Sequence, residues 1–364
     1  MIDLGYVLPI LDKINIGNIM GGQGAQLFTD NGVYVDMFCD NGVVSLGYDY
    51  RNSELAHLPN AYKDDIRELA STKLCNETHC KMRYAFFTNS GTEAVESMMK
   101  FGRKYQSQFN KDKVYFKKGV FHGRTYGSMS GDKSGKAYHL DGYGPFVGET
   151  YEFSKVEEID KNAAVVIITP AMVYDGFQKW DEDWFKKLSD YCEFYDILLG
   201  LDEVQTYIRL GEWWGYQTYH GIEPDMMAAA KGVAGGKPAS VCLMKHKIGE
   251  SIAKGGHFST FGGNRTAMRG IIDFHKRGNG LMEKAINDGE YIKRMLKDKV
   301  KNLRGQGMMW SFDVENPINF RNKCLKNHVI LGVFSNNQSI KLTPPLTIRS
   351  SSLEFAMEVL VKCL

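Results

Sequence analysis

Three residues whose side chains could serve one cofactor lie close together in the middle of this 364-residue sequence. Asp202 and Gln205 directly follow the short apolar run 197–201, and Lys231 directly follows a second apolar run, 226–230. Runs of this length and composition are typical of strands that are buried on both faces. Ligands of an open α/β sheet bind outside the carboxyl ends of its strands, so these three side chains could point into one crevice.

Pyridoxal phosphate would use this set of groups. Its aldehyde needs a lysine amine to form a Schiff base, and its ring nitrogen needs a neighbouring carboxylate to stay protonated. Lys231 and Asp202 could fill these two roles. Gln205 could donate a hydrogen bond to the phenolic oxygen, and Val204 offers an apolar surface for the ring. The alternative is that Asp202 and Glu203 form a solvated turn and that Lys231 is a surface lysine.

A candidate phosphate site precedes this stretch, at the start of a predicted helix. The apolar run 84–87 predicts a strand, and Ser90 followed three residues later by Glu93 is the pattern of a capping box. Free backbone N–H groups at such a helix start bind phosphate, and Gly91 would let the backbone approach it closely. Ser90 and Thr92 add hydroxyl groups. Plain helix capping, which needs no ligand, is the alternative explanation.

A third group of candidates lies in the segment 119–125, where an aromatic ring, an imidazole and a guanidinium flank a glycine. Phe121 could stack on a flat ring. Arg124 could bind a carboxylate through two parallel hydrogen bonds. His122 lies between them in the sequence.

Composition excludes several classes of protein. The chain is 43% hydrophobic and 24% charged, with a formal net charge of +2, as in ordinary soluble globular proteins. Near-neutral charge without a basic run argues against nucleic acid as a partner. The seven cysteines have no paired spacing, so we expect neither disulfides nor a metal site. The sequence shows no signal peptide and no membrane-spanning run, so we expect a cytoplasmic protein that does not bind membranes.

Strands alternate with helices between residues 84 and 201, which predicts an α/β fold with a mostly parallel sheet. The order of elements after residue 290 lacks continuous strand-helix-strand repetition and predicts a separate, smaller domain. Further predicted elements are a hairpin at 27–38, helices at 54–75, from 266 onward and at 353–363, and strands at 163–168, 240–244, 308–314 and 329–334.

Six motifs, in order over nearly the whole chain, resemble those of the class III aminotransferases of fold type I. This group of pyridoxal phosphate enzymes includes acetylornithine and ornithine aminotransferases. The motifs are FTNSGTEA at 87–94, FHGRT at 121–125, DEVQT at 202–206, EPD at 223–225 leading to AKG at 230–232, STFGGN at 259–264, and PPL at 344–346. The resemblance implies a large cofactor-binding domain at 46–270 with a mostly parallel mixed sheet. A small α+β domain would come from both chain ends, 1–45 and 271–364.

The resemblance also implies roles for individual residues. Lys231 would form the Schiff base and later move the substrate proton, while Asp202 would stabilise the protonated ring nitrogen. Thr260 would reach the phosphate from the second subunit, so the expected functional unit is a homodimer. Lys237 is the rival for the Schiff base, but it lies in a predicted loop. The cofactor-binding residues expected from the resemblance are Ser90, Gly91, Thr92, Phe121, His122, Asp202, Val204, Gln205, Lys231 and Thr260.

Two replacements affect the expected substrates. Ornithine-type enzymes pair a glutamate with an arginine at the active site, whereas this chain has Tyr174 and Lys341 at those positions. A lysine cannot reproduce the planar fork that binds a carboxylate. Arg124 would remain as the main carboxylate anchor for an amino acid whose distal amine reacts, as in an ornithine-like donor. A 2-oxo acid such as 2-oxoglutarate would be the acceptor. The alternatives are an amino-acid racemase or epimerase on the same scaffold, and a protein of this fold without catalysis.

Overall fold

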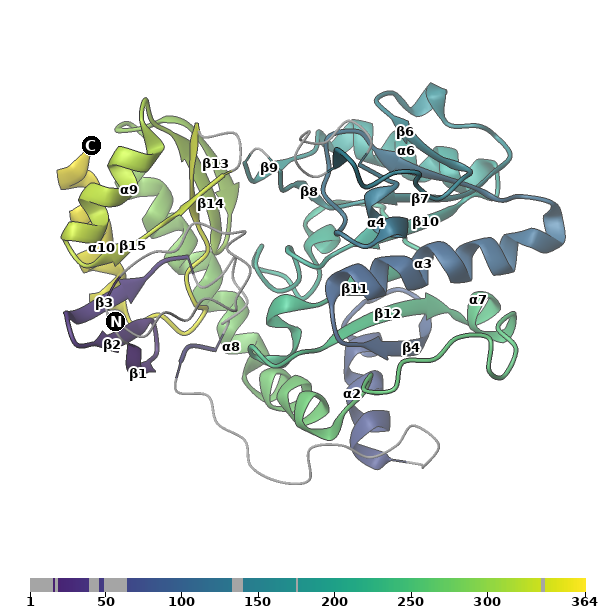
Figure 1. Ribbon diagram of the computed structural model, residues 1–364, viewed down its shortest axis with the longest axis horizontal. Coiled ribbons are helices and arrows are strands. Elements are labelled where there is room, and N and C mark those ends of the chain that lie inside the picture. The colour runs from purple at the N-terminus through teal and green to yellow at the C-terminus, as the bar shows by residue number, and fades with distance from the viewer. Residues whose placement is uncertain are drawn as a thin grey trace.

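The chain forms two lobes joined by one long helix, α8 (Arg265–Leu296), as Figure 1 shows. The computed structural model describes residues 16, 19–38, 46–48, 64–132, 140–174, 176–334 and 338–364. One lobe is built around a seven-stranded sheet. The other lobe holds strands from the N-terminal part of the chain together with strands and helices from the C-terminal part. None of the helices in the described part of the chain is long and apolar enough to span a membrane.

The seven-stranded sheet has the order β4-β12-β11-β10-β7-β5-β6. Neighbours from β11 to β6 pair in parallel, and β12 pairs antiparallel with both β11 and β4. The predicted α/β fold with a mostly parallel mixed sheet is therefore confirmed. The strands are β4 (Met82–Thr88), β5 (Lys113–Lys117), β6 (Thr150–Phe153), β7 (Ala163–Ile168), β10 (Leu198–Asp202), β11 (Met226–Ala229) and β12 (Ser240–Lys245).

Helices cover both faces of this sheet, which explains why its central strands are continuously apolar. Every residue of β7 and β10 is buried. Helix α3 (Gly91–Gln106) packs Met98 against Val165 on one face. On the other face, α6 (Glu182–Phe194) packs Phe185 in the same cluster as Val166. Gly102 lets α3 approach closely, since a Cβ atom there would lie 2.2 Å from Val165.

The register of the central strands brings the chemistry-bearing residues to one edge. Asp202, the last residue of β10, pairs with Ala228 of the parallel strand β11. Lys231 therefore follows the adjacent strand by two residues and begins the short 3₁₀ turn η4 (Lys231–Ala234). Both side chains lie at the carboxyl edge of the sheet, where ligands of open α/β sheets bind.

Helix α2 (Asp65–Asn76) covers the second half of the helix predicted at 54–75. Asp64 has extended backbone, and its side chain accepts a hydrogen bond from the backbone of Ile66 at 3.1 Å, so it is the N-cap of the helix. The predicted continuous helix at 54–75 is therefore wrong, because the extended backbone of Asp64 interrupts it and begins a helix there. Residues 49–63 lie outside the described part of the chain.

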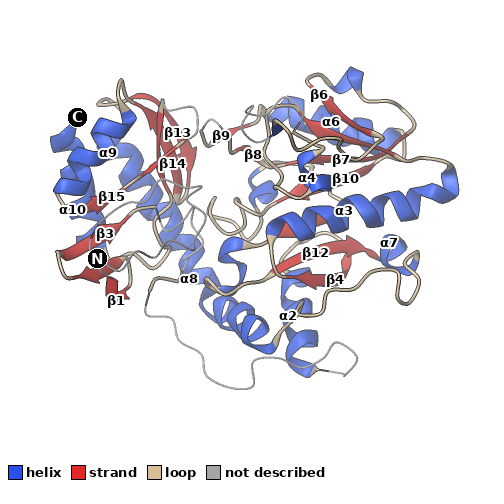
Figure 2. Ribbon diagram, viewed as in Figure 1, coloured by secondary structure: helices blue, strands red, loops and turns tan. Residues whose placement is uncertain are grey.

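The second lobe contains two four-stranded sheets, of order β1-β2-β3-β15 and β13-β14-β17-β16. Figure 2 shows α9 (Pro317–Lys326) and α10 (Ser350–Cys363) beside these strands. The predicted hairpin at 27–38 is confirmed by the antiparallel pair β2 and β3. The strands are β1 (Ile19–Gln23), β2 (Gln26–Thr29), β3 (Gly32–Asp36), β13 (Lys301–Gln306), β14 (Met309–Asp313), β15 (Val329–Ile330), β16 (Gly332–Val333) and β17 (Ser339–Leu342).

The predicted single strand at 329–334 is wrong, because the structure divides it between the two sheets. β15 pairs in parallel with β3, whereas β16 pairs antiparallel with β17. The chain passes close to Phe38 at Gly332, where a Cβ atom would lie 2.5 Å from the aromatic ring. The predicted domain ranges remain a prediction, and their boundary at 270 falls inside α8.

Candidate active site

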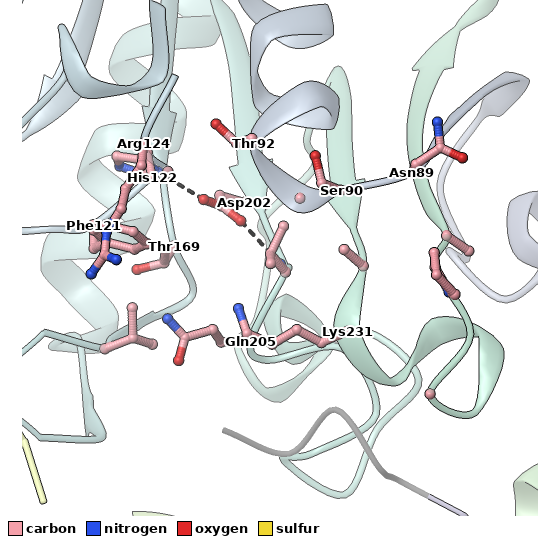
Figure 3. Close-up of a pocket in the computed structure, with 18 of the residues that line it drawn as sticks. Asn89, Ser90, Thr92, Phe121, His122, Arg124, Thr169, Asp202, Gln205 and Lys231 are labelled. Carbon is pink, nitrogen blue, oxygen red and sulfur yellow. Dashed lines mark hydrogen bonds and ion pairs between the residues drawn. The ribbon is translucent and has the colours of Figure 1, made fainter. Parts of the chain in front are cut away.

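A cavity of about 420 Å³ lies at the carboxyl edge of the seven-stranded sheet, beside the start of α3 (Figure 3). This volume is within the usual range for sites that bind small molecules. The cavity brings together ten of the residues proposed from the sequence: Ser90, Gly91, Thr92, Phe121, His122, Arg124, Asp202, Val204, Gln205 and Lys231. Thr260 is exposed and is not among the described residues that line this cavity.

Asp202 is held in a fixed orientation by two hydrogen bonds. Its Oδ2 atom lies 2.9 Å from Nδ1 of His122, and its Oδ1 atom accepts a hydrogen bond from the backbone of Val204 at 3.0 Å (Figure 3). Both the carboxylate and the imidazole are buried. A buried carboxylate is stable only with such partners, so Asp202 presents a preorganised negative charge to the cavity.

The neighbouring Glu203 points away from the cavity and is fully buried. Its carboxylate accepts hydrogen bonds at 2.9 Å from the backbones of Gly215 and Tyr216 and another from the hydroxyl of Thr206. Burial raises the pKa of Glu203 to about 7. Neither acid is solvated, so the alternative of a solvated turn at Asp202 and Glu203 is wrong.

The start of α3 differs from the predicted capping box. Ser90 is the N-cap, but its side chain makes no cap hydrogen bond to the helix. Its hydroxyl instead donates to Oε2 of Glu93 at 2.6 Å, and the backbone of Asn89 donates to the same atom at 3.1 Å. Neither hydrogen bond of a capping box is therefore formed, because the Glu93 carboxylate accepts from the residue before the N-cap and from the Ser90 hydroxyl. Because the hydroxyl does not cap the helix, the first N–H groups of α3 stay available for an anion.

Gly91 occupies a position where the cavity allows no side chain. A Cβ atom there would lie 2.6 Å from Cγ1 of Val204. Thr92 lies on the other side of the helix start, where its Oγ1 is 2.8 Å from Oγ1 of Thr125 and 2.7 Å from Oγ of Ser128. The backbone of Gly91 and the apolar face of Val204 thus form adjoining walls, as a flat ring with a phosphate at one end requires.

Lys231 has a backbone conformation that L-residues rarely adopt, with φ of 45°. Strained residues of this kind cluster at functional sites, where the surrounding structure holds them in place. Figure 3 shows its side chain in the cavity beside Gln205, on the opposite side of Asp202 from Thr92. A second lysine, Lys237, also lines the cavity, and burial lowers its pKa.

Arg124 and Phe121 form one wall of the cavity. The guanidinium carbon of Arg124 lies 5.6 Å from the centre of the Phe121 ring, within the range of a cation–π contact. The ring of Tyr174 lies 6.2 Å from that of Phe121, centre to centre, behind this wall. Lys341, on β17, directs its amine to the ring of Phe334 at 4.4 Å. Neither Tyr174 nor Lys341 is among the described residues that line the cavity.

Eight lining residues were not considered for the site from the sequence: Asn89, Gly123, Thr169, Val173, Ala230, Gly236, Pro238 and Ala239. A further lining residue, Lys237, was considered only as the rival lysine. The first residue after β7 is Thr169, which occupies the same kind of strand-end position that identified Gln205 and Lys231. The strand-end rule alone could therefore have identified it. Lys237 and the residues around it follow a turn whose path the local sequence does not specify.

The cavity is cationic and suits pyridoxal phosphate. Arg124, Lys231 and Lys237 line it, and Asp202 is the one carboxylate among its described lining residues. Asp202 suits a protonated ring nitrogen, the start of α3 suits a phosphate, and Lys231 offers an amine. These groups lie on separate walls of one cavity, so the residues fit the cofactor.

The sequence is similar to those of known proteins. Residues 18–364 match the family model described as aminotransferase class-III. The chain is 34% identical to an acetylornithine aminotransferase of Archaeoglobus fulgidus, with 93% of each chain covered. It is 30% identical to a [LysW]-aminoadipate semialdehyde/glutamate semialdehyde transaminase of Sulfurisphaera tokodaii, with 93% of this chain and 92% of the relative covered.

Comparison of the structures agrees with the fold. An ornithine aminotransferase of Toxoplasma gondii superposes with a TM-score of 0.88 at 21% identity, covering 97% of this chain and 91% of the other. An amine transaminase from an uncultivated Pseudomonas species, solved in its PLP-bound form, gives a TM-score of 0.86 at 19% identity. That alignment covers 98% of this chain and 97% of the other. At these identities the likeness shows the fold.

Proposed function

Because this chain belongs to the class III aminotransferases, which use pyridoxal phosphate, we propose that it moves an amino group from an amino acid bound by Arg124 to a 2-oxo acid such as 2-oxoglutarate. The observation that carries the proposal is that Arg124 lines the same cavity as Lys231 and Asp202. One cavity thus holds a carboxylate anchor, an amine and an acid, which are the groups that this reaction needs.

The charge of the cavity supports substrates that carry carboxylates. Two of its three cations, Arg124 and Lys237, are not needed to hold the cofactor, and its one described carboxylate, Asp202, already pairs with His122. A donor with a second protonated amine would therefore find no free carboxylate to pair with among the described lining residues. We propose an ornithine-like donor whose distal amine reacts. The acetylornithine aminotransferase at 34% identity supports a donor with its other amine masked.

Bound pyridoxal phosphate supplies an aldehyde that exchanges amines and a ring that withdraws electrons. Lys231 would hold the cofactor and then move a proton at the substrate carbon that carries the amine. Asp202 would keep the ring nitrogen protonated, and Gln205 would donate a hydrogen bond to the phenolic oxygen. Arg124 would orient the substrate through two hydrogen bonds to one carboxylate.

We propose that the phosphate site is completed by Thr260 of a second copy of the chain. Thr260 is exposed in the single chain, and the aromatic residues on either side of it are exposed as well, Phe258 by 64% and Phe261 by 62%. Large apolar side chains exposed together mark interaction surfaces. A homodimer would cover them. A cytoplasmic location remains our expectation.

The test is a screen of amino donors against 2-oxoglutarate and pyruvate with the purified, cofactor-loaded enzyme. We expect N-acetylornithine or a similar masked donor to react faster than free ornithine, with glutamate formed from 2-oxoglutarate. Faster reaction of free ornithine would contradict the proposed donor. Conversion of one amino-acid enantiomer into the other without any oxo acid would support the racemase and contradict the proposed transfer.

A further inference from the structure

Two buried polar atoms, one of them on a residue that lines the cavity, lack hydrogen-bond partners within the described residues. One is Nε2 of His122, the ring nitrogen opposite the one that contacts Asp202. The other is Oδ1 of Asp132. Asp132 is 3% exposed and the side chain of His122 is fully buried. Buried polar atoms without partners are rare because leaving one unpaired is costly.

The two residues pack around the same aromatic ring. The ring of His122 lies 5.3 Å from the centre of the Phe116 ring. Gly131, which precedes Asp132, is so close to that ring that a Cβ atom would lie 2.3 Å from it. Asp132 follows the short helix α4 (Tyr126–Met129), and hydrogen bonds of the helix and of the residues after it fix its backbone.

Two charged groups, on His122 and Glu152, influence Asp132. His122 favours ionisation of Asp132, whereas Glu152, on β6, opposes it. Burial is the largest influence and raises the pKa of Asp132 to about 7. Its carboxyl group can therefore carry a proton near neutral pH, when a carboxyl in water would be ionised.

We propose that Asp132 is a positioning residue that is linked to Nε2 of His122 through one bridging water molecule, and so keeps a proton on Nδ1, facing Asp202. The inference rests on the proposed role of Asp202 at the ring nitrogen. It extends a chain of hydrogen bonds from the cofactor site to a carboxyl group that does not line the cavity.

A proton on Asp132 decides which tautomer of His122 is favoured. When Asp132 is protonated, it donates to the bridging water and the water donates to Nε2, so the single proton of a neutral imidazole stays on Nδ1. Without Asp132, a neutral His122 can carry its proton on Nε2. A lone pair on Nδ1 would then face the Asp202 carboxylate and repel it.

The test compares the affinities of two cofactors for the full-length chain. One is pyridoxal phosphate, and the other is its 1-deaza analogue, in which C–H replaces the ring nitrogen. Quenching of intrinsic fluorescence reports both affinities. The wild type should prefer pyridoxal phosphate. Asp132→Asn keeps a donor for the bridging water and should keep this preference, whereas Asp132→Leu should lose about tenfold of it. Affinity for the analogue should not change.

Glu152→Gln is the matched control, because it removes the other carboxylate near Asp132 and should keep the preference. An Asp132→Leu variant with the wild-type preference would overturn the inference, and so would an Asp132→Asn variant that loses as much as Asp132→Leu. A wild type without any preference would instead overturn the proposed role of Asp202, and this inference with it.

A second measurement uses the wild-type protein and needs no variant of Asp132. The nitrogen NMR signals of His122, assigned by their loss in His122→Gln, report which ring nitrogen carries the proton. We expect the proton of a neutral ring to lie on Nδ1 in the wild type at about pH 6, where Asp132 keeps its own proton. A neutral ring protonated on Nε2 would overturn the inference even if the variants failed to fold.

Discussion

His122 and Asp202 form a buried pair in which Nδ1 of the imidazole lies 2.9 Å from Oδ2 of the carboxylate. The pair joins the FHGRT segment to the end of β10, two parts of the chain separated by 80 residues. A carboxylate with a hydrogen-bonded imidazole on one side and the backbone of Val204 on the other cannot turn away from the cavity. The Asp202 carboxylate is therefore held facing the cavity, where it can interact with a bound ligand.

Replacing Asp202 by asparagine should remove the charge while keeping the shape. The oxygen of the introduced amide can still accept a hydrogen bond from Nδ1 of His122, so we expect the variant to fold. Loss of an electrostatic partner at the reacting group should lower kcat by about 10²- to 10³-fold. Steady-state kinetics at saturating cofactor measure this, with circular dichroism to confirm folding. A folded variant with the wild-type kcat would contradict the role of Asp202.

Reduction with borohydride should attach the cofactor to Lys231 and not to Lys237. Both lysines line the cavity, but Lys231 closely follows β11 and lies beside Gln205 in Figure 3. Mass spectrometry of the digested, reduced protein identifies the modified residue. Lys237→Met is the matched variant and should keep the attachment, whereas Lys231→Met should abolish it. Modification of Lys237 in the wild type would exchange the proposed roles of the two lysines.

Much of this site follows from sequence, because buried parallel strands are short apolar runs and their carboxyl ends meet at one edge. The runs before Asp202 and Lys231 show this directly, and the structure places both residues at that edge. The start of α3 was also predicted correctly at Ser90. Its hydrogen bonds were not, because the same residues can cap a helix in more than one arrangement.

Features that depend on distant partners could not be predicted. The segment 329–334 reads as one strand, but it divides because its two halves pair with β3 and β17, which lie far apart in the sequence. Asp132 lies in a Gly- and Lys-rich stretch that predicts a loop. Its burial depends on Phe116 and His122, which no local pattern around Asp132 indicates.

Arg124→Ala should raise KM for carboxylate substrates by about 10- to 100-fold, the cost of losing hydrogen bonds to a charged group. Its guanidinium lies in the wall beside Phe121, away from the buried pair of Asp202 and His122, so kcat should change less than KM. An amine without a carboxylate serves as the control substrate and should react equally well with both enzymes. Unchanged KM for an amino-acid donor would show that another group binds the carboxylate.

Gly91→Ala should weaken the binding of pyridoxal phosphate and lower the free energy of unfolding by about 1–3 kcal/mol, because its Cβ would overlap Val204. Gly280→Ala is the matched control. Gly280 lies in α8 with no atom within 4 Å of a built Cβ, and alanine there should stabilise the protein by about 0.5–1 kcal/mol. Denaturant unfolding and cofactor titration measure both variants. A Gly91→Ala variant with unchanged affinity would show that the backbone there is not close to the cofactor.

Asp132 should make stability fall with rising pH. Burial raises its pKa in the folded chain to about 7, whereas in the unfolded chain it stays at about 3.9. Between these values the folded state binds more protons than the unfolded state, so stability is fully present below about pH 4 and is lost as pH rises to about 7. Above that, the difference is constant.

The Asp132→Asn variant cannot titrate at this position, so its stability relative to the wild type should rise between about pH 4 and about pH 7 and then level off. Urea unfolding of the cofactor-free proteins at several pH values measures this difference, and subtraction cancels the titration of groups that both proteins share. Glu152→Gln provides the control, because Glu152 adds to the high pKa of Asp132, and its loss should shift the decline of stability to lower pH without abolishing it. Parallel stability curves for the wild type and Asp132→Asn would show that Asp132 is ionised throughout this range.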